Sequence, residues 1–338
     1  MAIRRNQWLT FTLVIVLATA VASLASHVAV WSLGIKTRYG KMQSYESNNR
    51  GTVALLHGSS IAYDGIDWSR VASALGGRIE SWATAGSSPS EWEYFDRSIA
   101  GATETIIVVS AYDLNEHWLS DYRAAIVPFG DAMRDMRLCG FDKDLCKRIL
   151  SQYPQELVRV LFPSAGRSDG VLVGLRAKLV PLLTRQSDDD SARAPAAVPG
   201  PSDNVEKLSE WPVARLQRRL ALLEQAITRR HAFDGPKRRS LERLIRSARA
   251  RGTVTIVVMP VSGVYRQSFL TPQLMAALDN EVDNLASRDS GVSAIRLDRL
   301  QALDDDALFA DFVHLNKFGQ AIATSALLER IAQGRARP

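Results

Sequence analysis

Two stretches far apart along the chain carry residue types that acyl-transfer chemistry uses together. A Gly-Ser-Ser sequence at 58–60 follows the apolar run 52–57, and Asp311 and His314 lie three positions apart near the C-terminus. A carboxylate bonded to one imidazole nitrogen fixes the tautomer, which leaves the other nitrogen to take a proton from a serine. Each stretch alone has a simpler interpretation, as a helix cap and as a local salt bridge respectively.

Glycine and polar side chains also follow two other apolar runs. In ATAGSSPSEW, the backbone N–H of Gly86 is a candidate oxyanion donor, and Ser88 or Ser90 is a candidate helix cap, although an ordinary turn fits as well. The run 105–111 is followed by three polar side chains that can donate, accept or orient: Tyr112, Asp113 and Asn115.

The apolar runs themselves predict the strands of a parallel sheet. Five of them are short, rich in β-branched residues and bounded by Gly, Pro or charge: 52–57, 78–83, 105–111, 253–260 and 292–298. Segments of helical periodicity lie between them, so we predict a three-layer α/β/α sandwich with a five-stranded parallel sheet. Ligands collect beyond the carboxyl ends of such strands, which is where we expect all four polar stretches to lie.

The first 35 residues predict a transmembrane anchor. Residues 6–35 contain no Asp, Glu, Lys or Arg, and a helix from Trp8 to Trp31 would be roughly 36 Å long. Both tryptophans stand where interfacial aromatics are expected, and Arg4 and Arg5 precede the run. A cleaved signal peptide is the alternative, because ATAVASLAS offers small-residue cleavage sites. The length of the apolar run favours an uncleaved anchor.

Two further segments lie outside the predicted sandwich, which takes residues 52–115 and 251–338. Residues 36–51 form a polar neck, and residues 116–250 form a mainly helical insertion between the third and fourth strands. Within the insertion, the Pro-, Ala-, Ser- and Asp-rich segment 185–204 predicts a mobile loop. The insertion is interpreted as a platform for substrate or partner, or as a cap with only a packing role.

The chain has two cysteines, Cys139 and Cys146. On one continuous helix they would lie about 10 Å apart, which is too far for a disulfide. Gly140 favours a helix end between them, however, and in an oxidising compartment we expect a disulfide that closes this small loop. Two buried thiols are the alternative. No metal-ligand spacing is evident, and we expect neither metal nor cofactor.

The formal net charge of +6 is spread over Arg-rich helical segments with acidic residues between them. This pattern is typical of solvated helix faces, so we do not expect nucleic-acid binding, whereas contact with an anionic polymer or lipid headgroup remains open. No Gly-x-Gly-x-x-Gly follows the first strand, which argues against a Rossmann-type nucleotide site. His57 is expected to be a core histidine, and His117 and His231 have no evident carboxylate partner in the sequence.

The order of these stretches resembles the SGNH, or GDSL-like, hydrolase superfamily. An early Gly-x-Ser follows strand one, a glycine follows strand two, a polar block follows strand three, and DFVHLNKFG supplies a late Asp-x-x-His. The resemblance covers about residues 52–111 and 253–333. It implies the same three-layer, flavodoxin-like sandwich.

The resemblance also implies roles for single residues. Ser60 matches the nucleophile, His314 the general base and Asp311 its orienting carboxylate. The oxyanion hole would use the backbone N–H groups of Ser60 and Gly86, with Asn115 as a third donor.

Two positions depart from the family pattern. Ser59 stands where many members have Asp, a change seen in membrane-associated acyltransferase-like relatives. The usual Gly-x-Asn-Asp of the third block aligns with residues 110–113, so that Tyr112 replaces the expected asparagine, and Asn115 is the nearest substitute. The departure affects the oxyanion hole and leaves the triad intact.

The anchor and the Gly-Ser-Ser sequence together resemble the members that O-acylate surface polymers, such as alginate acetyltransferases and the teichoic-acid D-alanyl transfer protein. The resemblance implies a single-pass protein of the inner membrane whose catalytic domain is periplasmic. It would receive acyl groups, most simply acetyl, through an integral membrane O-acyltransferase in a polysaccharide synthesis or export complex and pass them to a polysaccharide. A carbohydrate esterase with the same triad, and a non-catalytic polysaccharide-binding or assembly protein on a degenerate fold, are the alternatives.

Overall fold

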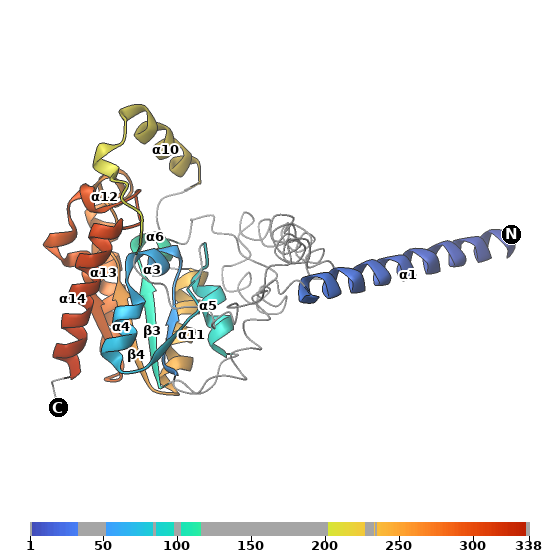
Figure 1. The fold of residues 1–338 in the computed structure, drawn as a ribbon, viewed down its shortest axis with the longest axis horizontal. Helices are drawn as coiled ribbons and strands as arrows, with labels where there is room; N and C mark the ends of the chain where they lie inside the picture. The colour runs from blue at the N-terminus through green and yellow to red at the C-terminus, as the bar shows by residue number, and fades with distance from the viewer. Residues whose placement is uncertain are drawn as a thin grey trace, which may run out of the picture. The chain divides into compact units, whose positions relative to one another are not determined.

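The computed structural model describes residues 2–32, 52–83, 86–97, 103–115, 202–226, 233 and 235–335 (Figure 1). These residues belong to two compact units: α1 to the first, and all the other described elements to the second. Several predictions fall outside the described residues: the neck, His117, the cysteine pair, His231 and most of the loop at 185–204.

The first unit contributes one described helix, α1 (Ala2–Ser32). Its segment Thr10–Val28 has a mean hydropathy of 2.0, and only 6% of that segment is buried. This helix is long and apolar enough to cross a membrane, as the sequence predicts, and a signal sequence has the same properties. Its orientation and its cleavage therefore stay predictions.

The second unit is built on a parallel sheet whose strand order is β2-β1-β3-β4-β5. The strands are β1 (Thr52–His57), β2 (Arg78–Ser81), β3 (Glu104–Val109), β4 (Thr253–Val258) and β5 (Val292–Arg296). Each coincides with a predicted run to within two residues at either end, and the predicted fold class is confirmed. The strand order reverses between β1 and β3, which is where ligands bind in sheets of this topology.

Helices cover both faces of the sheet because successive strand residues point to opposite sides. On one face, Leu56 of β1, Ile106 and Val108 of β3 and Val257 of β4 are buried in a single core. Three helices that contribute to this core are α3 (Ser60–Gly65), α4 (Trp68–Leu75) and α14 (Lys317–Arg335). On the other face, Ile107, Val109 and Ile256 pack against α5 (Pro89–Arg97), α11 (Pro236–Arg249) and α13 (Pro272–Ser287) (Figure 1).

Two described helices come from the segment predicted as an insertion. α11 buries Leu241, Leu244 and Ala248 in the second core, so this helix is one of those that cover the sheet. α10 (Val213–Ala226) follows the short 3-10 helix Leu208–Glu210, whose first residue donates its N–H to the carbonyl of Phe309 at 2.7 Å. That bond joins the base of α10 to the chain just before Asp311.

The remaining described elements are short. α6 (Ala111–Leu114) follows β3, and α12 (Gly263–Phe269) follows β4. After β5, the chain forms three 3-10 turns at 297–299, 301–303 and 306–308 before it reaches the loop that carries His314.

Gly58 connects β1 to α3 at a point where the structure has no room for a side chain. A Cβ on Gly58 would lie 2.4 Å from the Cβ of Ala62 and 3.2 Å from the carbonyl oxygen of Val108. The first turn of α3 therefore lies directly against β3. This close approach sets the position of Ser60, the first residue of the helix.

We expect Gly58→Ala to lower the free energy of unfolding by about 1 to 3 kcal/mol, because the added methyl group overpacks a rigid contact. Gly76→Ala is the matched control. Gly76 has φ +74° and nothing within 4 Å of an added Cβ, so its loss comes from the left-handed backbone alone, about 1 kcal/mol. Denaturant unfolding measures both variants, and a smaller loss at Gly58 than at Gly76 would contradict the packing argument.

Candidate active site

Three side chains form one line of hydrogen bonds at the carboxyl edge of the sheet. Nε2 of His314 lies 2.7 Å from Oγ of Ser60, and its Nδ1 lies 2.8 Å from Oδ2 of Asp311. The structure thus brings together the serine, the imidazole and the carboxylate that the sequence singles out, although 254 positions separate Ser60 from His314. The distances are those of a serine whose hydroxyl proton can pass to an imidazole.

Ser60 is positioned by the turn that starts α3. The hydroxyl of Ser59 accepts the backbone N–H of Ile61 at 3.2 Å and so caps the helix, which leaves Ser60 as the first helical residue. Ser59 is almost fully buried, whereas Ser60 is partly exposed. Of the two serines, Ser60 is therefore the accessible one.

The loop before α14 holds Asp311 and His314 in register. Oδ1 of Asp311 accepts the backbone N–H groups of Val313 and His314, both at 2.9 Å, in addition to its contact with the imidazole. The backbone N–H of Ala310 donates to the carbonyl of His314 at 2.8 Å and closes the turn. The carboxylate thus organises the loop that carries its own partner.

Asn316 is a positioning residue that the sequence analysis does not single out. Its Nδ2 donates to the carbonyls of Glu206 and Ala307, at 3.0 and 2.8 Å, and its Oδ1 accepts the N–H groups of Phe318 and Gly319 at the start of α14. The signal was available, because an asparagine just before a helical segment is a favoured N-cap.

The electrostatics of the site favour a charged imidazole. Burial alone lowers the pKa of His314, but the hydrogen bond and charge of Asp311, together with the charges of Asp64 and Asp113, raise it above its ordinary value. Burial raises the pKa of Asp311 in turn, yet its bond to His314 and two backbone N–H groups bring it below the usual range. Asp64, one turn beyond Ser60 on α3, has its pKa raised mainly by burial.

A buried carboxylate from the third block lies beside the nucleophile turn. Asp113 accepts the hydroxyl of Ser110 at 2.9 Å and interacts with the hydroxyl of Ser59. Burial raises the pKa of Asp113, and the bonds from Ser59 and Ser110 partly offset this. The interaction links the end of β1 to the end of β3. Asp113 is the third of the four residues of α6.

The segment that carries Gly86 is tied to the nucleophile turn by its neighbour. Oγ of Ser87 donates to the carbonyl of Gly58 at 2.7 Å and accepts the indole N–H of Trp92 at 2.8 Å. Gly86 is exposed and has a left-handed φ of +67°. α5 begins at Pro89, so Ser88 stands just before the helix, whereas Ser90 lies inside it. The role of Gly86 as an oxyanion donor stays a prediction.

Tyr112 and Asn115 differ in how they face the site. Tyr112 lines the cavity in front of His314, whereas Asn115 is fully buried at the end of α6 and its carbonyl accepts Nζ of Lys237 at 2.8 Å. Burial, with the nearby charge of Asp113, raises the pKa of Tyr112 far above its ordinary value, so its hydroxyl stays protonated. The prediction of Asn115 as third oxyanion donor is not tested by these contacts.

His57 lies beside the Gly-Ser-Ser turn but points to a different partner. Its Nε2 lies 3.3 Å from Oδ1 of Asp96, and both side chains are fully buried. Asp96 also forms an ion pair with Arg251. His57 therefore fits the prediction of a core histidine.

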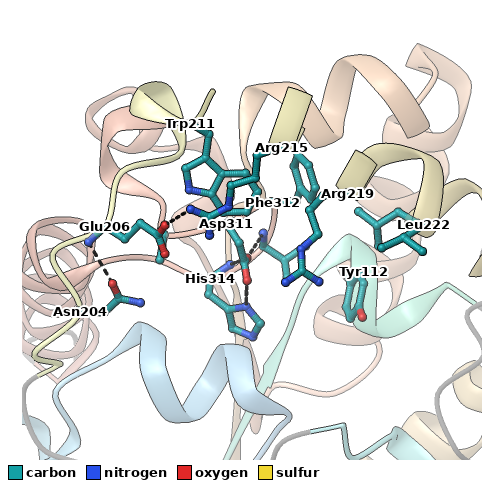
Figure 2. A pocket seen from close by; sticks show the side chains of 13 residues that line it. Tyr112, Asn204, Glu206, Trp211, Arg215, Arg219, Leu222, Asp311, Phe312 and His314 are labelled. Atoms are coloured by element: carbon teal, nitrogen blue, oxygen red, sulfur yellow. Dashed lines mark hydrogen bonds and ion pairs between the residues drawn. The ribbon is translucent and has the colours of Figure 1, made fainter. Parts of the chain in front are cut away.

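A cavity of about 460 Å³ opens in front of the imidazole (Figure 2). One wall comes from the His314 loop and another from α10 and the chain that leads into it. Side chains of Asp311 and His314 are 40% and 26% exposed, so a ligand in the cavity reaches the base. Among the described residues, no group of three His, Cys, Asp or Glu side chains is placed to hold a metal ion.

Comparisons with known proteins add little to this geometry. No family model and no curated protein matches the chain. One solved structure, described as a platelet activating factor from Streptococcus pneumonia, aligns with 12% sequence identity and a TM-score of 0.40, over 87% of this chain and 92% of that chain. A likeness this distant identifies no activity.

We expect ester cleavage by this protein to rise with pH and to level off above the pKa of His314. The imidazole accepts the proton of Ser60 only when it is neutral, and its raised pKa keeps it protonated to a higher pH than an ordinary histidine. With 4-nitrophenyl acetate as substrate, the midpoint of the rise in rate with pH therefore lies above the ordinary pKa of histidine.

Asp311→Asn moves that midpoint to lower pH, because it removes the hydrogen bond and charge that raise the pKa of His314. The rate at the plateau falls on the order of 10³ to 10⁴-fold, because an amide N–H that donates to Nδ1 favours the tautomer whose Nε2 already carries a proton and cannot accept one from Ser60. Asp289→Asn, which breaks an ion pair with Arg249 at the amino edge of the sheet, is the control and leaves the profile in place. A midpoint that does not shift in Asp311→Asn would contradict the proposed coupling.

Proposed function

We propose that the chain is a membrane-anchored, extracytoplasmic serine acyltransferase that O-acylates a polysaccharide, most simply with acetyl groups. The observation that carries the proposal is the hydrogen-bonded line from Asp311 through His314 to Ser60, open to a cavity at the carboxyl edge of the sheet. The resemblance of the four polar stretches to SGNH hydrolases supports the same chemistry.

The reaction follows from the positions of these atoms. Nε2 of His314 takes the hydroxyl proton as Oγ of Ser60 attacks an ester carbonyl, and Asp311 stabilises the imidazolium. The tetrahedral intermediate collapses when the imidazolium returns the proton to the leaving alcohol, which leaves an acyl group on Ser60. An acceptor hydroxyl then repeats the sequence in reverse. Backbone N–H groups of Ser60 and Gly86 are the proposed donors to the oxyanion.

Transfer rather than hydrolysis is supported by what surrounds the base. α10 supplies one wall of the cavity, with Leu222 and Leu223 facing the space in front of His314. An apolar wall favours a bound alcohol over free water as acceptor. The apolar helix α1 supports an anchored enzyme, supplied by an integral membrane O-acyltransferase within a polysaccharide synthesis or export complex.

A carbohydrate esterase with the same residues is the second candidate. The observation that favours it is the exposure of His314 and Asp311, since water reaches a base that is 26% exposed. Both reactions pass through the same acyl-enzyme and differ only in the acceptor.

Ser60 is expected to react with a fluorophosphonate probe in the full-length protein in detergent. Ser60→Ala abolishes the labelling because the nucleophilic oxygen is lost. Ser59→Ala is the matched control: it retains labelling while losing about 1 to 3 kcal/mol of stability, because both the helix cap and the hydrogen bond to Asp113 are lost. Mass spectrometry locates the adduct. Labelling that persists in Ser60→Ala, or no labelling of the wild type, would refute the enzyme proposal. The non-catalytic polysaccharide-binding or assembly protein would then be the remaining alternative.

Product analysis separates the two enzymatic candidates. With 4-nitrophenyl acetate as donor, we expect acetylated oligosaccharide to accumulate faster than free acetate once acceptor oligosaccharide is added. The acceptor must also shorten the lifetime of the acetyl-Ser60 species seen by intact-protein mass spectrometry. Release of acetate alone, at a rate that added oligosaccharides do not change, would instead establish the esterase.

A further inference from the structure

The cavity in front of His314 contains several charged side chains, and most of them are already paired. Asp311 is bonded to the imidazole. Arg215 forms an ion pair with Glu206, and its guanidinium stacks on the ring of Trp211, 3.8 Å from the ring centroid. Each of these charged side chains therefore already has a partner in the wall of the cavity.

Arg219 is the exception. It lies one helical turn after Arg215 on α10, so both side chains emerge on the same face of the helix. Figure 2 shows its side chain extending from α10 toward the cavity, and it is one of the residues that line the space in front of His314. Within the described part of the chain, no carboxylate pairs with its guanidinium, and the residue is exposed.

The neighbours of Arg219 explain why it stays unpaired. Glu206, the nearest acid of the cavity wall by sequence, is held by Arg215, and Asp311 is held by His314 and two backbone N–H groups. Apart from Asn204, the rest of the lining is apolar or aromatic: Tyr112, Trp211, Leu222, Leu223, Ala310, Phe312 and Val313. A mostly apolar cavity with one guanidinium that has no carboxylate partner is a suitable site for a small ligand group of opposite charge.

We propose that Arg219 forms an anion subsite that binds the carboxylate of an acidic sugar in the acceptor polysaccharide. The planar guanidinium matches a carboxylate with two parallel hydrogen bonds. A volume of about 460 Å³ is within the range of sites that enclose a small ligand, and its aromatic lining provides surface for the apolar faces of a sugar ring. The inference rests on the proposed function, because it assumes that the acceptor hydroxyl reaches Ser60 through this cavity.

The test compares binding of three probes to the full-length protein in detergent by calorimetry: a galacturonic acid trimer, a neutral galactose trimer and a glycerol-phosphate trimer. Arg219→Gln removes the charge. Arg218→Gln removes the same charge from the same helix, at an exposed position that does not line the cavity. Arg219→Lys keeps the positive charge but removes the planar guanidinium that can form two parallel hydrogen bonds. Thermal unfolding of all three variants shows whether each is folded.

We expect the uronate trimer to bind more weakly to Arg219→Gln, by about tenfold, which is the usual effect of one charge-assisted contact at a partly exposed site. Arg218→Gln binds it as the wild type does, and Arg219→Lys is intermediate. Equal uronate affinity in the Arg219→Gln and Arg218→Gln variants would overturn the subsite. Binding of the neutral trimer as tight as that of the uronate trimer would also overturn it. Tighter binding of the glycerol-phosphate trimer would show that the group recognised is not a sugar carboxylate.

Fluorophosphonate labelling of the same samples separates this inference from the proposed function. Uronate binding that depends on Arg219 in a protein whose Ser60 is unreactive supports the subsite and refutes the acyltransferase. A reactive Ser60 with uronate binding that ignores Arg219 refutes the subsite and leaves the acyltransferase standing.

Discussion

The 2.7 Å contact between Ser60 and His314 is the constraint on which the rest of the site depends. It joins the end of the first strand to a loop near the C-terminus, so it persists only if α14 is fixed against α3 and α4. Two bonds do this: Nε2 of Gln320 donates to the carbonyl of Asp64 at 3.0 Å, and the N–H of Asp67 donates to Oγ1 of Thr324 at 2.9 Å. These bonds to the last helix therefore hold the His314 loop next to Ser60.

The fold was predictable from the sequence because its signals are local. Apolar runs such as 105–111 and 253–260 are short and β-branched, and the helical segments between them leave few arrangements other than a parallel sheet. The triad residues were predictable for a related reason: Ser60 follows a strand directly, and Asp311 and His314 form one turn. The side-chain contacts that hold them were not, since Gln320 and Ser87 have no local pattern that marks a partner far along the chain.

The cavity wall was the least predictable part. α10 belongs to a segment whose composition predicts helices but not where they pack, and its contact with the site depends on a backbone bond from Leu208 to Phe309, about a hundred positions away. Periodicity along α10 shows a polar face and an apolar face, yet the sequence cannot distinguish Arg218 from Arg219. Only the position of the helix over the cavity gives the two arginines different surroundings.

The serine at position 59 is explained by its neighbour. Its hydroxyl caps α3 and also meets the buried carboxylate of Asp113, whose pKa burial raises. An aspartate at 59 would bring a second carboxylate close to the buried carboxylate of Asp113, and one of the two would have to hold a proton. Asp113 also contributes to the raised pKa of His314, so a protonated Asp113 would weaken the base next to Ser60. A neutral hydroxyl at position 59 caps α3, donates a hydrogen bond to Asp113 and leaves unchanged the charge that helps to raise the pKa of His314.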